Sequence, residues 1–277
     1  MTPRLWLGLV FLLSLDPAQA TESPWRDLGP VPGTVQSFPP QGMAFAAGRL
    51  LFTHHQQDHA STLFVLDAVT MAINARATLP PEATHTSGLA WDGTRLWAVD
   101  YNSQALYLLD LEATLARGHA VVLGRWTTDL GGASALTWVE LDGAGYLAIS
   151  DFLHSSRSYL LPVGALGPPG PVDVAGLAAC SWSNGMFSQG LGWDGHYLYE
   201  AVNRFGTDEV RVYDLRAAMA AGAPCEPTPI ASFPAGGPGV EDLASDGTRL
   251  WTSDERSWRF YVLDDLAGLR DRWSTND

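Results

Sequence analysis

The stretch that decides the fold is residues 87–110, SGLAWDGTRLWAVDYNSQALYLLD. It contains three short runs in which apolar and polar residues alternate, a pattern typical of half-buried β-strands. The Asp92-Gly93 pair between the first two runs favours a hairpin turn. The stretch therefore predicts three antiparallel strands joined by tight turns.

The same pattern recurs in four other places: residues 41–67, 134–163, 189–215 and 241–264. Successive copies start 46, 47, 55 and 52 residues apart. A further apolar run follows each of the first four copies, at residues 73–79, 119–126, 172–177 and 230–233. Four strands in a unit of about 40–50 residues is the signature of a propeller blade. We therefore predict an all-β, five-bladed β-propeller with four antiparallel strands per blade and almost no helix.

The fifth copy lacks a fourth strand, since little regular pattern follows Leu266. The segment WRDLGPV, residues 25–31, precedes the first copy and has no partner there. We expect it to supply the outer strand of the last blade, which closes the ring and covers an open edge. The alternative is two separate β-domains, which the even spacing of the copies disfavours.

The first 20 residues have the features of a secretory signal peptide. Arg4 precedes an 11-residue apolar core, LWLGLVFLLSL, and Ala18-Gln19-Ala20 is a small-x-small cleavage site. The core is too short to span a bilayer, which needs about 20 residues. We expect cleavage after Ala20, a single domain over residues 21–277, and a secreted or periplasmic location.

The charge of the chain excludes several classes of partner. The net charge is −14 and the sequence contains no lysine. Nucleic acid is a poor partner because phosphate binding needs clustered Lys and Arg. The lack of lysine also excludes Schiff-base catalysis and a P-loop. We expect a monomer that binds a small molecule, a peptide or a protein.

Polar residues are expected to meet at one mouth of the central channel. In each blade the first strand lines the channel, and alternating strand directions bring its start and the end of the second strand to one face. The first-strand starts are Gln41, Ser87, Ser134, Gln189 and Glu241, and the second-strand ends are His54, His55, Asp100, Asp151, Asn203, Asp254 and Glu255, with His85 just before the second blade. This mouth is either a binding or catalytic site or a wet channel whose polar residues satisfy turns.

No sequence motif fixes a cofactor or a nucleophile. Asp100, Asp151, Asp254 and Glu241 are candidates to surround calcium, although no local calcium loop is present. The run His54-His55-x3-His59 lacks a standard zinc spacing. A Gly-x-Ser-x-Gly nucleophile elbow is missing. Calcium therefore stays an open possibility, and the metal ligands stay unassigned.

The two cysteines, Cys180 and Cys225, permit one disulfide in an oxidising compartment. Cys180 is expected to follow the outer strand of the third blade, on the mouth face, and Cys225 to lie near the opposite face. Because bridging requires Cα atoms within about 7 Å, the sequence leaves the pairing open.

One stretch resembles a known family. Phe187-Ser188-Gln189-Gly190-Leu191, then Leu198-Tyr199-Glu200, then Phe205-Gly206 and Val210-Arg211 form a series similar to one in the plant and bacterial type of glutaminyl-peptide cyclotransferase, itself a five-bladed propeller. Val240-Glu241-Asp242-Leu243 resembles the Gly-Glu-Gly-Leu that opens the next blade in that family. The resemblance covers about 75 residues. It departs from the family at Ala201-Val202, which replace Ser-Thr, at Asp242, which replaces Gly, and in order, since the series here forms the fourth copy.

The resemblance implies a reaction in which the α-amine of an N-terminal glutamine attacks its own side-chain amide and ammonia leaves. Glu241 would relay the proton and Gln189 would bind the amide or the oxyanion. Phe187 and Trp193 would wall the pocket, and the other expected binding residues are Glu200, Asn203, His85, Asp100, Asp151 and Asp254.

The departures from the family rank a non-catalytic propeller that binds its ligand at the mouth slightly ahead. A glutaminyl cyclase-like enzyme and a calcium-assisted hydrolase or lactonase are the alternatives. A pocket in which Glu241 and Gln189 approach one common point within about 3 Å would favour the enzyme.

Overall fold

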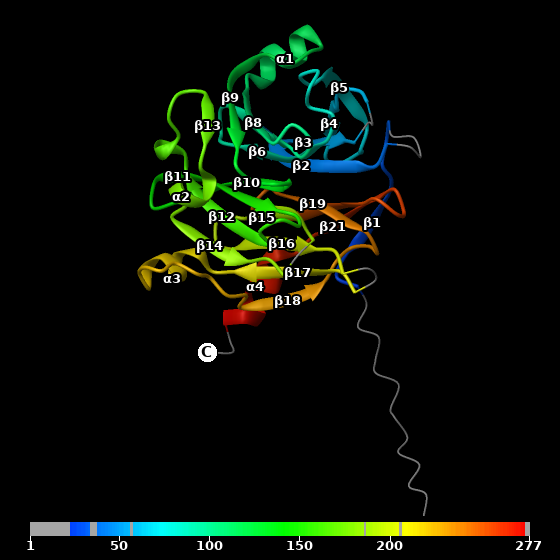
Figure 1. Ribbon diagram of the computed structural model, residues 1–277. Helices are drawn as coiled ribbons and strands as arrows, with labels where there is room; N and C mark the ends of the chain where they lie inside the picture. Colours follow the sequence, from blue (N-terminus) through cyan, green and yellow to red (C-terminus); the bar gives the residue numbers. More distant parts are fainter. Residues whose placement is uncertain (1–22, 34–37, 56–57, 186, 205–206, 275–277) are drawn as a thin grey trace, which may run out of the picture.

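The computed structural model describes residues 23–33, 38–55, 58–185, 187–204 and 207–274. The expected signal peptide, and Phe205-Gly206 of the family resemblance, lie outside these residues. The described chain forms five small antiparallel sheets arranged as the blades of a β-propeller, as predicted (Figure 1).

The innermost strands form the wall of the channel. They are β2 (Pro40–Ala46), β6 (Thr86–Trp91), β10 (Ala133–Leu141), β15 (Ser188–Trp193) and β19 (Val240–Ser245). Each contacts the inner strand of the next blade, and β19 contacts β2, so the ring is closed. Every inner strand also has a register shift against its partner near the mouth, which is a β-bulge that bends the strand there.

The remaining strands extend each blade outward. Blade 1 adds β3 (Arg49–His54), β4 (Thr62–Asp67) and β5 (Ile73–Thr78); blade 2 adds β7 (Leu96–Asp100), β8 (Ala105–Leu109) and β9 (Val122–Thr128); blade 3 adds β11 (Ala144–Asp151), β12 (Arg157–Pro162) and β14 (Cys180–Ser183); blade 4 adds β16 (Leu198–Val202), β17 (Glu209–Tyr213) and β18 (Ala231–Pro234); blade 5 adds β20 (Leu250–Asp254) and β21 (Arg259–Leu263). The hydrophobic core is divided among the five interfaces between neighbouring blades.

The N-terminal segment closes the last blade. Strand β1 (Arg26–Pro30) pairs antiparallel with β21, and Arg26 and Asp264 form an ion pair of 2.7 Å at its end. Just before the strand, the indole N–H of Trp25 donates to the carbonyl of Pro234 in the neighbouring blade. Figure 1 shows this blue strand beside the orange and red end of the chain. The prediction that residues 25–31 complete the fifth blade is confirmed.

The outer strand of blade 3 differs from the prediction. Residues 172–177 were expected to form it, but β14 does so instead. Strand β13 (Gly170–Val172) joins β9 of blade 2 in parallel, and Asp173 caps the short helix α2 (Val174–Leu177) by accepting from the N–H of Gly176. The prediction was wrong because a short apolar run does not distinguish a strand from a turn of helix.

Helices are more frequent than the sequence periodicity predicted. Helices α1 (Leu111–Arg117), α3 (Leu215–Ala220) and α4 (Leu266–Ser274) follow the third strands of blades 2, 4 and 5, and a 3-10 turn covers Val163–Ala165 in blade 3. Asp110 and Asp214 each accept a hydrogen bond from the N3 backbone N–H of α1 and α3. An aspartate is a strong N-cap, so it starts a helix too short to show a period. No helix among the described residues is long and apolar enough to cross a membrane.

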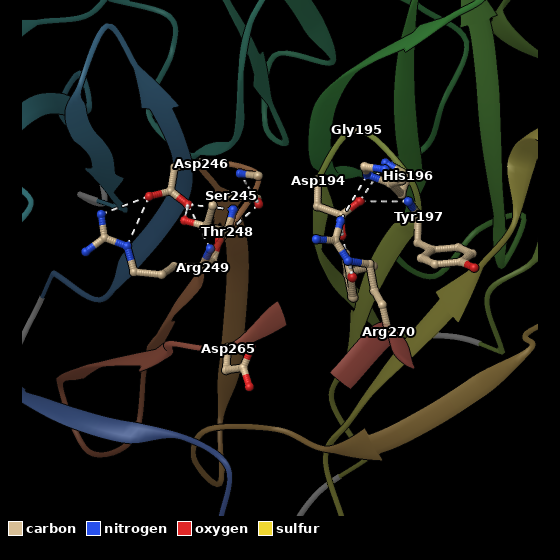
Figure 2. Close-up of polar contacts among 12 residues, drawn as sticks. Asp194, Gly195, His196, Tyr197, Ser245, Asp246, Thr248, Arg249, Asp265 and Arg270 are labelled. Carbon is tan, nitrogen blue, oxygen red and sulfur yellow. Dashed lines mark hydrogen bonds and ion pairs between the residues drawn. The ribbon is translucent and has the colours of Figure 1, made fainter. Parts of the chain in front are cut away.

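The Asp-Gly pairs of blades 2, 4 and 5 shape hairpins at the end of the channel away from the mouth. Figure 2 shows two of them: Asp194 Oδ1 accepts from the N–H groups of His196 and Tyr197, and Asp246 Oδ1 from those of Thr248 and Arg249. Each following glycine has a φ near +90°, a conformation that other residues rarely adopt. Asp92 and Gly93 repeat the arrangement in blade 2.

A disulfide joins Cys180 and Cys225, whose Cα atoms lie 4.7 Å apart. Cys180 is the first residue of β14 and therefore lies at the end away from the mouth, near the loop that leads into β18. Its expected position on the mouth face was wrong because the outer strand of blade 3 starts eight residues later than predicted. The bond links blades 3 and 4.

Candidate functional site

The channel mouth holds a cavity of about 250 Å³. The second residue of each inner strand lines it, at the positions that the repeat predicted for the mouth: Gln41, Ser87, Ser134, Gln189 and Glu241. The bulge in each inner strand lies at this level. The repeat therefore produces one ring of five polar side chains around the axis.

Side chains of this ring connect neighbouring blades. Ser87 Oγ donates to the carbonyl of Ala133, and Ser134 Oγ donates to the carbonyl of Ser188, both at 2.6 Å. Gln189 Nε2 donates to Glu241 Oε1 at 3.1 Å across the interface of blades 4 and 5. This hydrogen bond brings together the two residues for which the sequence predicted catalytic roles.

Glu241 is a buried acid at the edge of the cavity, with 2% of its surface exposed. Burial raises its pKa well above the ordinary value, and the nearby carboxyl of Glu255 raises it further through charge repulsion and a hydrogen bond between the two groups. A hydrogen bond between two carboxyl groups needs a proton, and the raised pKa of Glu241 favours its protonated form. The pair is therefore equipped to give and to accept a proton.

Two stacked histidines form the wall of the cavity along blades 1 and 2. The rings of His55 and His85 lie 4.0 Å apart and are inclined by only 6°. His85 Nε2 and Gln41 Oε1 are 2.7 Å apart, and burial with the neighbouring His55 lowers the His85 pKa to about 3. His85 is thus a neutral imidazole whose Nε2–H donates to the Gln41 amide oxygen.

Aromatic rings continue the wall through blades 2 to 4. Tyr101 lies 5.1 Å from His85, Phe152 lies 6.3 Å from Tyr101, and Phe187 lies 5.3 Å from Phe152 between ring centroids. Tyr101 and Phe152 line the cavity. Phe187, whose backbone φ is +60°, packs edge-on against Phe152. The cavity has an acidic side in blade 5 and an aromatic wall along the other blades.

The aspartates predicted for the mouth are used by turns. Asp100 accepts from the backbone N–H groups of His85 and Ser103, both at 2.7 Å. Asp254 accepts from those of Gly239, Arg256 and Ser257, and Asp151 from those of His154 and Ser155. These carboxylate oxygens already accept hydrogen bonds from backbone N–H groups, and a hard cation such as calcium would have to replace those donors to bind there. The described residues contain no group of three or more His, Cys, Asp or Glu arranged to hold a metal ion.

Two further predicted residues lie away from the cavity. Glu200 is fully buried between blades 3 and 4, where it accepts hydrogen bonds from Ser158, Ser188 and Tyr213. Trp193 lies at the other end of the channel, in a recess of about 140 Å³ that it shares with Trp91 and Trp138. It ends β15, whose first residue is at the mouth, so the strand carries it to the opposite face.

Asn203 lies at the mouth face beside Phe187. It is 5% exposed, and its backbone N–H donates to the Phe187 carbonyl at 3.0 Å. The position follows from the end of β16, which reaches the mouth as predicted.

The sequence did contain a signal for Tyr101 and Phe152, which were not predicted at the mouth, whereas His55 and Glu255 were. In blades 1, 2, 3 and 5 the residue that follows the second-strand end lines the cavity: His55, Tyr101, Phe152 and Glu255. The preceding residue is turned toward the backbone, so the next side chain faces inward because strand side chains alternate.

Comparisons with known proteins find likeness in fold alone. No protein-family model and no curated protein matches the chain. The structure of glutaminyl cyclase from Myxococcus xanthus is similar, with a TM-score of 0.56 and 15% identity over 86% of this chain and 95% of that chain. A PQQ-bound aldose sugar dehydrogenase from Streptomyces coelicolor has a TM-score of 0.48 and 15% identity over 85% of this chain and 79% of its own, and a chain of a mitotic checkpoint complex has 0.48 and 12% over 82% and 76%. The chain is a propeller with a distant likeness to glutaminyl cyclase.

Proposed function

We propose that the channel mouth is an active site that cyclises N-terminal glutamine and releases ammonia. The observation that carries this proposal is the contact between Gln189 and Glu241, at 3.1 Å, beside Glu255 in the mouth cavity. A buried Glu241 with a raised pKa, hydrogen-bonded to a second carboxyl group, suits a reaction in which one proton must move from an amine to a leaving amide nitrogen. The fold likeness to a glutaminyl cyclase agrees with the proposal without identifying a substrate.

The proposed step balances. The neutral α-amine of the substrate attacks its own side-chain amide carbon, so a carbon–nitrogen bond forms and the oxygen becomes negative. The Glu241–Glu255 pair accepts one proton from the attacking nitrogen and gives its shared proton to the leaving nitrogen, which departs as ammonia. The pair ends with the proton it started with. Gln189 Nε2 carries a second N–H besides the one bonded to Glu241, and the proposal assigns it to the oxyanion.

Ammonia release from N-terminal glutamine dipeptides tests this function. Glu241→Gln keeps the size of the side chain but removes the proton relay, so we expect kcat to fall by on the order of 10²–10⁴-fold. Glu140→Gln is the matched control, because Glu140 is an exposed carboxylate near the opposite end of an inner strand. EDTA should leave the rate unchanged, whereas a loss would introduce a metal such as calcium. Folded wild-type protein that releases no ammonia would reject the cyclase.

A non-catalytic binding protein is the second candidate. The acidic pair facing the aromatic wall of Tyr101 and Phe152 favours it, because that arrangement suits a ligand with an amine at one end and a flat apolar group at the other. Calorimetry with Asn-Phe-amide, whose shorter side chain is not a substrate for the proposed cyclisation, measures binding alone. Binding that weakens in Glu241→Gln, together with no turnover of glutamine peptides, would support this candidate.

We also infer that the protein is exported. The disulfide between Cys180 and Cys225 supports this, because such bonds persist in oxidising compartments. Expression with and without residues 1–20 tests it: periplasmic or extracellular recovery of a chain that begins at Thr21 is expected only with the segment present.

A further inference from the structure

One position of the inner strands is occupied differently in the last blade. The residue after the mouth ring is Gly42, Gly88, Ala135 and Gly190 in blades 1 to 4, but Asp242 in blade 5. The glycines are required by close approach: a Cβ on Gly42 would lie 2.9 Å from the Cα of Gly88. A Cβ on Gly190 would lie 2.6 Å from the Cα of Asp242. Blade 5 alone carries a side chain with a polar end at this level.

The Asp242 carboxylate contacts the inner strands of several blades. Its Oδ2 accepts from the N–H of Met43 in blade 1 at 2.7 Å. Its Oδ1 accepts from Leu191 in blade 4 at 3.0 Å and from Leu243 in its own blade at 2.9 Å. The N–H of Leu89 in blade 2 also stabilises the charged form. A group that reaches blades 1, 2, 4 and 5 lies on the axis of the ring.

The architecture explains why donors converge there. An inner strand pairs with its blade on one edge only, so the N–H groups of its other edge point into the channel. A buried N–H group without a hydrogen-bond partner lowers the free energy of unfolding. Met43 and Leu191 are fully buried, so their N–H groups cannot bond to bulk solvent instead. The closing of the ring therefore creates a cluster of N–H groups that needs one acceptor.

The charge state of Asp242 follows from its partners. Burial raises its pKa well above the ordinary value, and the hydrogen bonds from the surrounding N–H groups offset only part of that rise. The contacts with Met43, Leu191 and Leu243 all come from N–H donors and use both oxygens, a geometry that suits an ionised carboxylate rather than a neutral acid with a proton to place. The same chemistry would hold any small anion that accepts hydrogen bonds on several sides.

We propose that the inner strands form an anion-binding site on the propeller axis, that the Asp242 carboxylate is its built-in ligand, and that this anchor positions the neighbouring Glu241 at the mouth. The anion half of the inference stands on the contacts alone. The positioning half rests on the proposed function, because it needs a reaction at Glu241 to be observed.

Chemical rescue tests the site. Asp242→Gly installs the residue found in three other blades and empties the axis. We expect a lower melting temperature. Sodium formate should restore it in a saturable manner, whereas sodium sulfate at equal ionic strength, whose anion is larger than the missing carboxylate, should not. The matched control is Asp194→Ala, which removes a buried carboxylate that also accepts backbone N–H bonds but lies in a hairpin turn. Formate should not rescue this control.

The positioning role has its own readout. Asp242→Gly should reduce kcat for ammonia release by on the order of 10²-fold with little change in KM, and formate should restore it together with stability. If wild-type protein releases no ammonia, the proposed function fails, while formate-dependent melting still decides the anion site. An unchanged melting temperature in Asp242→Gly, or equal formate effects in both variants, would overturn the site.

Wild-type protein supplies a second measurement if the glycine variant does not fold. The amide protons of Met43 and Leu191 should exchange with deuterium only through global unfolding, because the axial carboxylate holds them. The backbone amide of Val99, which is paired in the core, is the reference. If the amides of Met43 and Leu191 exchange more than about tenfold faster than this reference, the carboxylate does not bind them, and the proposal is overturned.

Discussion

Glu200→Ala should unfold the interface of blades 3 and 4 without acting on the mouth. Glu200 accepts from Ser158 at 2.6 Å, Tyr213 at 2.7 Å and Ser188 at 3.0 Å, and all three partners are fully buried. A hydrogen bond to a charged group contributes about 1.5–3 kcal/mol. Three of them give on the order of 6 kcal/mol, which approaches the whole stability of about 5–15 kcal/mol expected for a domain.

Glu200→Gln gives the contrast. Glutamine keeps the shape and one acceptor oxygen, and it removes the cost of burying a charge without a cation. We expect it to lose roughly 2 kcal/mol. Urea unfolding followed by tryptophan fluorescence gives both values, and Glu140→Gln controls for the loss of a carboxylate. A free energy of unfolding for Glu200→Ala within about 1 kcal/mol of wild type would refute the network argument. Folded Glu200→Gln should keep any activity of the mouth.

Four other outcomes are expected. Burial raises the pKa of Glu241 in the folded state. Its protonated form therefore contributes stability below the pKa of the unfolded chain, and that contribution is lost as the pH rises toward the pKa of the folded state. The urea midpoint should fall less between pH 5 and 8 in Glu241→Gln than in wild type. Replacing Cys180 and Cys225 by serine removes a bond with a sequence separation of 45, and calorimetry should show a loss of up to roughly 4 kcal/mol. Removing the segment that contains β1 exposes the edge of β21, so light scattering should show dimers or larger aggregates. Phe152→Ala should raise KM for glutamine peptides with an aromatic second residue more than for those with alanine, measured by ammonia release.

Much of the fold could be predicted because the repeat states it five times. The alternation of residues 87–110 fixed the strands, and the unpaired residues 25–31 indicated how the ring closes. The outer strand of blade 3 could not be predicted, because the short segment CSWS has no contrast with its surroundings and a longer apolar run lay before it. The helices were missed because a capping aspartate such as Asp110 needs few residues to start one.

The site was only partly accessible to sequence reasoning. The ring that includes Gln189 and Glu241 follows from strand direction alone. Strand direction does not predict which of two adjacent polar residues faces the cavity. Asp254 is turned toward the backbone because it accepts hydrogen bonds from three backbone N–H groups, whereas Glu255 lines the cavity. The role of Asp242 depends on backbone N–H donors from four blades, and one of these donors, Met43, lies 199 residues from Asp242 in the chain. No local pattern records such a meeting.

The pairing of β1 with β21 sets the order of events as the chain is made. Residues 26–30 leave the ribosome long before residues 259–263, the strand with which they pair. Until then the first strand has no sheet to join, and the blade 5 interfaces on both sides stay open. Ribosome-bound or half-translocated chains therefore carry exposed apolar surface for the whole of synthesis. Biogenesis of this propeller should depend on holding factors that keep the early strand unpaired until the final blade arrives.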